Sequence, residues 1–118
     1  MAIKVVKEKI SREELLNLAH KEFGDGVKAV VDVEQGIMAV GGELHADEET
    51  ELTEKHGSKR EFVWGINIYP KKTGEDWIEF DSMINIKPLQ NNSSRGVEDL
   101  EIQKSILGVV KKLTGDVS

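Results

Sequence analysis

The chain has 118 residues, of which 38% are hydrophobic and 32% are charged, and its formal net charge is −6. This length fits one domain with one core, and the apolar content excludes a disordered chain. The acidic balance makes nucleic acid an unfavourable partner because phosphate backbones are repelled. No apolar stretch approaches the roughly 20 residues that cross a bilayer, and the absence of cysteine excludes disulfides and thiolate metal sites. We therefore expect one cytoplasmic α+β domain over residues 1–118 that makes no membrane contact.

The N-terminal segment predicts a short strand over residues 2–6 and a helix over residues 12–23. Ser11 and Glu14 have the spacing of a capping box, and the apolar residues beside them occupy the positions of a hydrophobic staple. Apolar residues then recur at helical spacing as far as Phe23, after which two glycines favour a helix end.

The next segment predicts a β-hairpin followed by a short helix. Residues 27–33 and 37–40 are rich in β-branched side chains, and Glu34, Gln35 and Gly36 form a link of turn length between them. Residues 46–55 are mostly acidic and polar, which predicts a short exposed helix between strands.

Two longer strands are predicted in the second half of the chain. Residues 62–69 alternate strictly and have one apolar face, and residues 77–86 repeat the pattern until a proline ends each strand. Glu79 and Asp81 share one face of the second strand, roughly 7 Å apart, so a carboxylate pair for acid–base chemistry is geometrically allowed. A water-facing sheet surface is the simpler interpretation of these polar residues.

The C-terminal segment predicts an amphipathic helix with Asp99 as its N-cap and an apolar stripe from Ile102 to Leu113 that fades at Thr114 and Gly115. Strands lie between two terminal helices without regular βαβ alternation. We therefore expect an α+β fold with an antiparallel sheet of about four strands and both terminal helices packed on one sheet face.

A polar connection, residues 90–96, leads into this last helix and is the first candidate for a binding site. Backbone N–H groups at a helix start can hold an anion, and Arg95 can add a bidentate contact. Asn92, Ser94 and the upstream Lys87 complete the candidate set. The alternative is a solvated loop, since the two acids that follow it already satisfy the helix dipole and would repel an anion.

A second candidate is a metal site formed by His45, Asp47 and Asp81, with a bound water as the nucleophile of a small hydrolase. Their spacing matches no established metal motif, and an acidic helix start with an exposed histidine is the alternative interpretation. The sequence contains no nucleophile elbow, P-loop or dinucleotide fingerprint, so no cofactor is predicted.

Four segments carry a resemblance to a known family, namely GGELHAD (41–47), WGINIYP (64–70), EFDSMINIKP (79–88) and SRGVED (94–99). Through these segments the chain resembles a family of short prokaryotic proteins described only as a domain of unknown function. The resemblance implies a stand-alone domain and brings no activity, substrate or cofactor. Ser93 and Leu100 stand where the family pattern tends to have a basic residue and a proline, and both departures weaken the anion-site interpretation.

Three functions are consistent with these patterns. The first is a non-catalytic module that binds a small molecule or a protein through the loop before the last helix, with Arg95 as its principal contact. The second is the metal-assisted hydrolase. The third is a homodimer or a toxin–antitoxin-like partner protein, suggested by the aromatic residues Trp64, Tyr69 and Trp77 on predicted strands.

Overall fold

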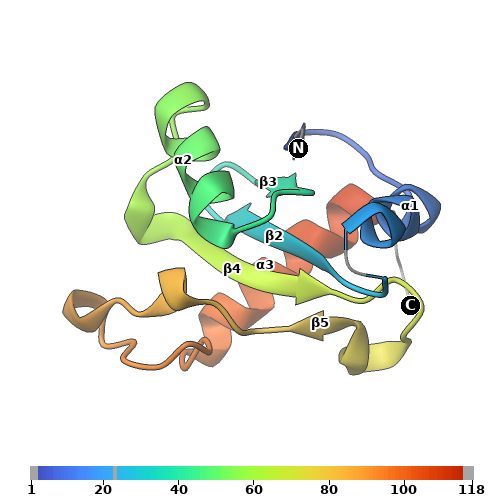
Figure 1. Cartoon of the computed structure of the whole chain (residues 1–118). Coiled ribbons are helices and arrows are strands. Elements are labelled where there is room, and N and C mark those ends of the chain that lie inside the picture. Colours follow the sequence, from blue (N-terminus) through green and yellow to red (C-terminus); the bar gives the residue numbers. More distant parts are fainter. Residues whose placement is uncertain (1–2, 23, 116–118) are drawn as a thin grey trace.

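The computed structural model describes residues 3–22 and 24–115 of the chain (Figure 1). The start of the first predicted strand at residue 2 and the predicted helix end at Phe23 lie outside these residues. The described helices are α1 (Arg12–Glu22), α2 (His45–Lys55) and α3 (Leu100–Thr114). The described strands are β1 (Lys4–Val6), β2 (Val27–Asp32), β3 (Ile37–Val40), β4 (Val63–Ile68) and β5 (Ile78–Glu79). Short 3-10 turns occupy Arg60–Phe62, Gly74–Trp77, Met83–Asn85 and Pro88–Gln90.

The described strands form one sheet in the order β1-β3-β2-β4-β5, and every neighbouring pair is antiparallel. Strand β4 pairs with β2 along its whole length, from Val63 opposite Asp32 to Ile68 opposite Val27. Its other edge pairs with β5 only at Asn67 and Ile68. The predicted antiparallel α+β fold is confirmed, with five strands instead of about four.

Both predicted helix starts have the expected caps. The Ser11 hydroxyl accepts from the Glu14 N–H at 3.0 Å, and the Glu14 carboxylate accepts from the Ser11 N–H at 3.5 Å. The Asp99 carboxylate accepts from the Glu101 N–H at 2.8 Å. Each cap satisfies backbone donors that the helix itself leaves unpaired.

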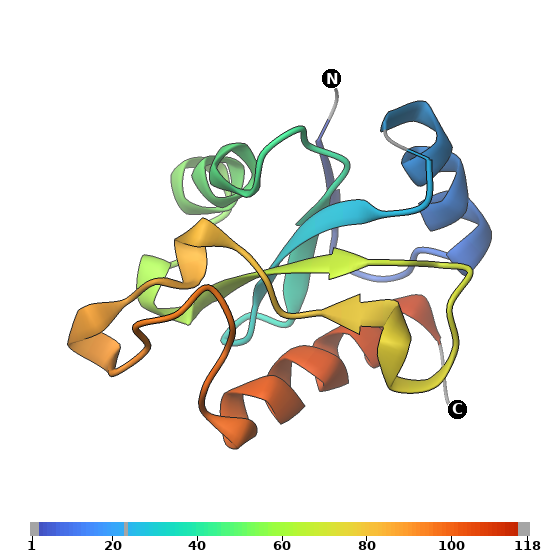
Figure 2. The same ribbon diagram turned by 60° about the horizontal axis from the view of Figure 1, so that its bottom comes forward.

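The terminal helices α1 and α3 pack in the same core, and α2 packs in a separate core on the other sheet face. Figure 2 shows α2 above the sheet and α3 below it. This larger core includes Leu15 of α1, Ile106 and Leu113 of α3, and Trp64 of β4. The Ile10 N–H just before α1 also donates to the carbonyl of Leu113 at 2.8 Å. The prediction that both terminal helices share one face is therefore confirmed.

Helix α2 is only partly the exposed helix that its composition predicts. Leu52 is fully buried in a second, smaller core with Val30, Ala39 and Val63 on the other sheet face. Glu48, one turn earlier, is also fully buried. The expectation was wrong for this face because a single leucine per two turns leaves no visible apolar stripe, although it suffices to anchor a short helix.

The predicted strand over residues 77–86 is wrong beyond its first residues. Strand β5 ends at Glu79, and the chain turns through Met83–Asn85, where the buried Ser82 hydroxyl accepts from the Ile84 N–H at 3.3 Å. Alternating isoleucines had suggested a strand, but Met83 and Ile86 are exposed and the polar Asn85 is fully buried. Of the face expected to be wet, Glu79 and Asp81 do reach solvent, whereas Asn85 lies on the inner side of this turn.

No helix within residues 3–22 and 24–115 is long and apolar enough to cross a membrane. The longest described helix is α3, with 15 residues, and it carries charged side chains along its length.

Glu48 gives the fold a pH dependence. Its Oε2 accepts from the Gly42 N–H at 2.9 Å, whereas its Oε1 is buried with no hydrogen-bond partner among the described residues. Burial raises the pKa of Glu48 well above its ordinary value, so the folded protein keeps this carboxyl protonated. The unfolded chain releases this proton near the ordinary pKa of glutamate. The free energy of unfolding therefore falls as the pH rises from that ordinary pKa through the raised pKa of the folded state.

We predict that Glu48→Gln removes this part of the pH dependence. The free energy of unfolding of the parent protein should fall relative to that of the variant as the pH rises above 4.5, the ordinary pKa of a glutamate. Urea unfolding at several pH values measures the difference, and Glu49→Gln on the same helix serves as the control. Parallel pH profiles of the parent and Glu48→Gln would show that Glu48 does not bury a proton.

Candidate functional site

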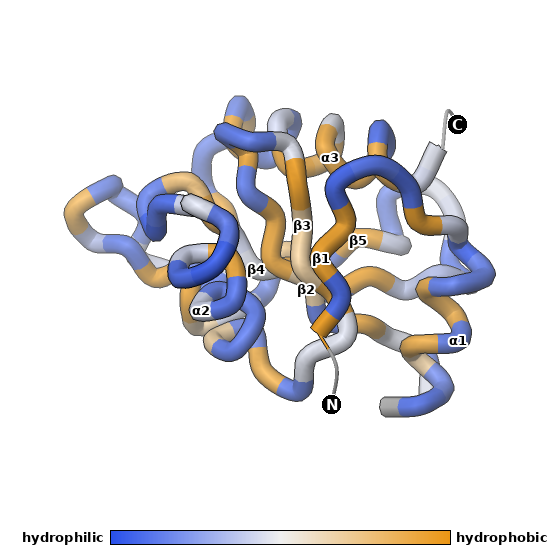
Figure 3. The backbone as a smooth tube through the Cα atoms, turned by 90° about the horizontal axis from the view of Figure 1, so that it is seen from above, coloured by the Kyte–Doolittle hydropathy of each residue, from blue (hydrophilic) through white to orange (hydrophobic). Residues whose placement is uncertain are grey.

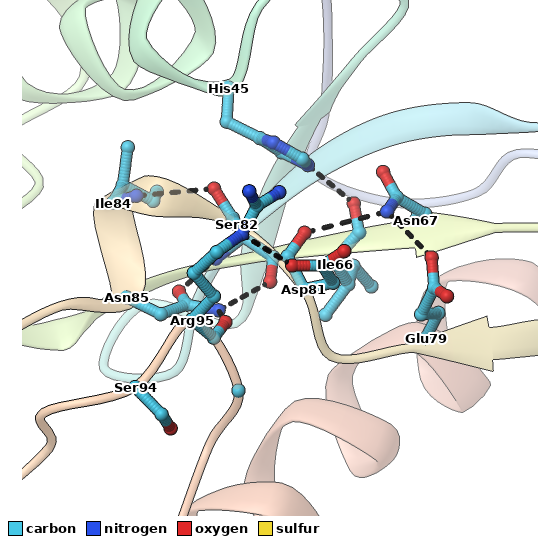
Figure 4. Close-up of polar contacts among 12 residues, drawn as sticks. His45, Ile66, Asn67, Glu79, Asp81, Ser82, Ile84, Asn85, Ser94 and Arg95 are labelled. Carbon is cyan, nitrogen blue, oxygen red and sulfur yellow. Dashed lines mark hydrogen bonds and ion pairs between the residues drawn. The ribbon is translucent and has the colours of Figure 1, made fainter.

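The centre of the candidate site is the side-chain amide of Asn85, which pairs with the backbone of β4 at Gly65 (Figure 4). Its Oδ1 accepts from the Gly65 N–H at 2.8 Å, and its Nδ2 donates to the Gly65 carbonyl at 2.9 Å. The same Nδ2 donates to the carbonyl of Arg95 at 2.9 Å. Asn85 thus replaces a strand residue beside β4 after β5 has ended, and it fixes Arg95 to the sheet.

The side chain of Asn92 also forms hydrogen bonds with the backbone, and it fixes the loop of residues 90–96. It is 4% exposed, and its Nδ2 donates to the carbonyls of Asn85 at 2.7 Å, Gly96 at 2.8 Å and Ser94 at 3.2 Å. Its Oδ1 accepts from the Glu98 N–H at 2.8 Å. The amide of Asn92 therefore closes the loop from inside, and all of its polar atoms are occupied.

Gly65 is required where this turn meets the sheet. A Cβ at this position would lie 2.5 Å from the Cβ of Ser82 and 3.2 Å from the ring of His45. Only glycine therefore allows the buried turn and the first residue of α2 to approach β4 this closely.

Arg95 lies on the outside of the fixed loop. Its Nε donates to Oδ1 of Asp81 at 2.7 Å, and the two side chains are 56% and 41% exposed. Within residues 3–22 and 24–115, neither terminal nitrogen of Arg95 makes a hydrogen bond to another residue. The ion pair therefore orients the guanidinium and leaves its two outer nitrogens for a ligand.

Glu98 occupies the position where the loop backbone would hold an anion. One of its carboxylate oxygens accepts from the Ser93 N–H at 3.1 Å and from the Ser94 N–H at 3.0 Å. The side chain of Ser94 is exposed, while its backbone contacts only the loop itself. A backbone anion site before α3 is thus already filled by a carboxylate of the chain.

Lys87 is half-buried and contacts residues other than Arg95. Its Nζ donates to the carbonyl of Arg60 at 2.7 Å and lies 5.1 Å from the centre of the Trp64 ring. Burial, with the nearby charge of Arg60, lowers the pKa of Lys87 despite an opposing effect of Glu49. Lys87 thus ties the turn to the segment before β4, and its ammonium group is engaged there and not with Arg95.

His45 approaches Arg95 and Asp81 from the first turn of α2 (Figure 4). Its Nε2 lies 2.8 Å from the carbonyl of Ile66, which can only accept, so Nε2 carries the proton. Burial lowers the pKa of His45, so the ring is neutral at neutral pH with Nδ1 as an acceptor. The interpretation of His45 as an exposed residue is wrong, because Gly65 lets the ring lie against β4.

The candidate metal ligands do not form one cluster. His45 and Asp81 come together, whereas Asp47 is exposed on the first turn of α2. No group of three or more His, Cys, Asp or Glu side chains suited to a metal ion occurs in the described parts of the chain.

The carboxylates of the predicted acid–base pair have separate partners. Glu79 accepts from Asn67 Nδ2 at 2.9 Å and from the Tyr69 hydroxyl at 3.0 Å, while Asp81 pairs with Arg95. Burial and the adjacent Glu79 raise the pKa of Tyr69, so its hydroxyl stays protonated and continues to donate. This arrangement orders the polar surface and leaves no pair of carboxyls sharing a proton.

Two hollows were missed by sequence reasoning. The larger, about 780 Å³, lies between α3 and β5 and is lined by Trp77, Phe80 and Leu107, with Glu75 and Lys111 as charged groups of opposite sign. The smaller, about 350 Å³, lies beside the turn that carries Met83, Ile86 and Leu89. Both depend on contacts between distant segments, and exposed leucines alone would have been their only signal.

Fold and site together define an α+β domain in which a loop held by two buried asparagines carries an oriented surface arginine. The chain matches, over residues 4–113, the family described as "Protein of unknown function (DUF5674)", and it belongs to that family. This confirms the resemblance seen in its sequence segments. No curated protein and no solved structure matches the chain.

We predict that Asn92→Asp strongly destabilises the fold, whereas Asn91→Asp does not. The first change removes the donors to three carbonyls and places a carboxylate in a buried site, which costs about 2–4 kcal/mol. Asn91 is exposed with φ of 59°, a conformation that Asp also tolerates, so its substitution should cost less than about 1 kcal/mol. Chemical denaturation compares the two variants, and equal losses would rule out the role assigned to Asn92.

Proposed function

We propose that the chain is a non-catalytic binding module that takes a carboxylate of a small molecule or a protein through Arg95. The observation that supports this most directly is the ion pair to Asp81, which orients the guanidinium and leaves its terminal nitrogens exposed. Arginine forms its strongest contacts when two parallel N–H groups meet a planar oxyanion.

Preorganisation supports the proposal. The loop backbone is fixed by the buried side chains of Asn85 and Asn92, and the guanidinium is fixed by Asp81. A ligand that binds here pays little conformational entropy, which favours affinity from a small number of contacts.

Local charge favours a carboxylate over a phosphate. Arg95 is paired with Asp81, and the whole chain has a formal net charge of −6. A dianionic phosphate would be repelled by these negative charges more strongly than a single carboxylate group.

The other loop residues have supporting roles in this proposal. Asn92 fixes the backbone, Lys87 fixes the turn, and the exposed hydroxyl of Ser94 is available for a hydrogen bond to a bound ligand. The neutral ring of His45 stands beside the guanidinium and can accept a hydrogen bond at Nδ1. The absence of cysteine fits a reducing compartment, and we place the binding function in the cytoplasm.

The proposal predicts that Arg95→Ala abolishes carboxylate binding without unfolding the protein. Titration of the ¹⁵N-labelled chain with N-acetylaspartate should shift amide signals of Asp81, His45 and Ser94 in the parent protein, and inorganic phosphate should shift them less. The exposed ion pair contributes at most about 1 kcal/mol to stability, so the variant should remain folded.

Arg60→Ala is the matched control, since Arg60 is also exposed but lies outside the Arg95 loop. It should leave the titration unchanged. Identical shifts in the parent and Arg95→Ala, or no saturable response to the carboxylate, would refute the proposed function.

A further inference from the structure

An exposed apolar surface surrounds the smaller hollow, on the turn that follows Ser82. Met83, Ile86 and Leu89 are 64%, 39% and 101% exposed, and all three line the hollow of about 350 Å³. Figure 3 shows hydrophobic colour at the tip of this projecting turn, beside α2. Three large apolar side chains around one concave surface are typical of a protein contact site and not of a solvated loop.

The turn is held rigidly in this exposed position. Lys87 Nζ donates to the carbonyl of Arg60 at 2.7 Å, and Gln90 Nε2 donates to the carbonyl of Glu61 at 3.0 Å. The backbones of Lys87 and Asn92 also exchange two hydrogen bonds, at 2.7 and 3.1 Å. These bonds fix the backbone of the turn on both sides of Leu89, whose side chain is fully exposed.

The rim of the hollow carries both signs of charge. Its acidic groups are Glu49 and Glu61, and its basic groups are Arg60 and Lys87. This surface is locally balanced, although the chain as a whole has a formal charge of −6. Two copies of the chain can therefore approach through this surface without the repulsion that their net charge causes elsewhere.

We propose that this surface, defined by Met83, Ile86, Leu89 and the hollow beside them, joins two copies of the chain in a symmetric dimer. Leu89 of one copy enters the hollow of the second copy, and the relation is reciprocal, as twofold symmetry requires. Such an interface must be complementary to itself, which an apolar projection beside an apolar hollow with a rim of both charges provides.

The small extent of the surface sets the strength of the dimer. Stable interfaces bury about 1,200–2,000 Å² in total, and a single turn with one hollow lies below that range. The dimer therefore exchanges with monomer in a concentration-dependent way. Arg95 pairs with Asp81 and does not line this hollow, so this inference does not depend on the proposed carboxylate contact.

Sedimentation equilibrium of the full chain over a wide concentration range tests the dimer. The parent protein should fit a reversible monomer–dimer equilibrium. Leu89→Asp should weaken dimerisation by at least about tenfold, the effect expected for an anchor residue at the centre of an interface. Because the Leu89 side chain is fully exposed in the monomer, the unfolding transition of this variant should match that of the parent.

Leu100→Asp is the matched control. Leu100 is 67% exposed at the start of α3, away from the hollow, and an acid is tolerated in the first turn of a helix. This variant should dimerise like the parent protein, and so should Arg95→Ala.

Three results would overturn the inference. They are a parent protein that stays monomeric at the highest concentration reached, equal weakening by Leu89→Asp and Leu100→Asp, and association that continues beyond two copies without a defined dimer.

Discussion

The pairing of the Asn85 side chain with the peptide of Gly65 is the interaction on which the second half of the structure depends. At this point the edge of β4 opposite β2 has no further strand beside it, because β5 pairs only with Asn67 and Ile68. An amide side chain has one acceptor and one donor group, and it can satisfy the backbone N–H and C=O of one strand residue together. Asn85 does so, and it thereby attaches the loop that contains Arg95 to the edge of β4.

Two consequences follow from this attachment. The Arg95 carbonyl accepts a hydrogen bond from the same Asn85 amide, which attaches this part of the loop to the sheet. Asn92 fixes the loop from inside through the carbonyls of Asn85 and Gly96. The segment fixed in this way carries both an oriented arginine and an exposed apolar turn. Both proposed contact surfaces share one internal hydrogen-bond network, since buried polar groups are stable only when they are satisfied.

The network also explains which features the sequence could predict. The caps at Ser11 and Asp99 depend on residues two or three positions apart, and the alternation of β4 depends on one strand, so local patterns suffice. The partners of Asn85 at Gly65 lie 20 positions away, and a buried asparagine has no signal in a single sequence. Its alternating isoleucine neighbours therefore predicted a strand that the structure does not contain.

The same distinction between local patterns and distant contacts applies to the candidate site residues. Arg95 was found because an arginine in a polar loop is visible in the sequence, and Asp81 was found for a different role. Asp81 orients Arg95, and Glu98 accepts hydrogen bonds from the backbone N–H groups of Ser93 and Ser94. Both contacts depend on how the loop returns to the sheet. The exposed tip at Leu89 resembles any surface leucine until the turn that holds it is known.

Amide hydrogen exchange tests the central role of Asn85 and Asn92 most directly. The N–H of Gly65 donates to Asn85, and the N–H of Glu98 donates to Asn92, so each is held by a side chain and not by a backbone carbonyl. If the side-chain network holds the loop, both amides exchange slowly, at rates comparable with those in the β2–β4 ladder. Rapid exchange at Gly65 and Glu98 beside a protected β4 would contradict the account.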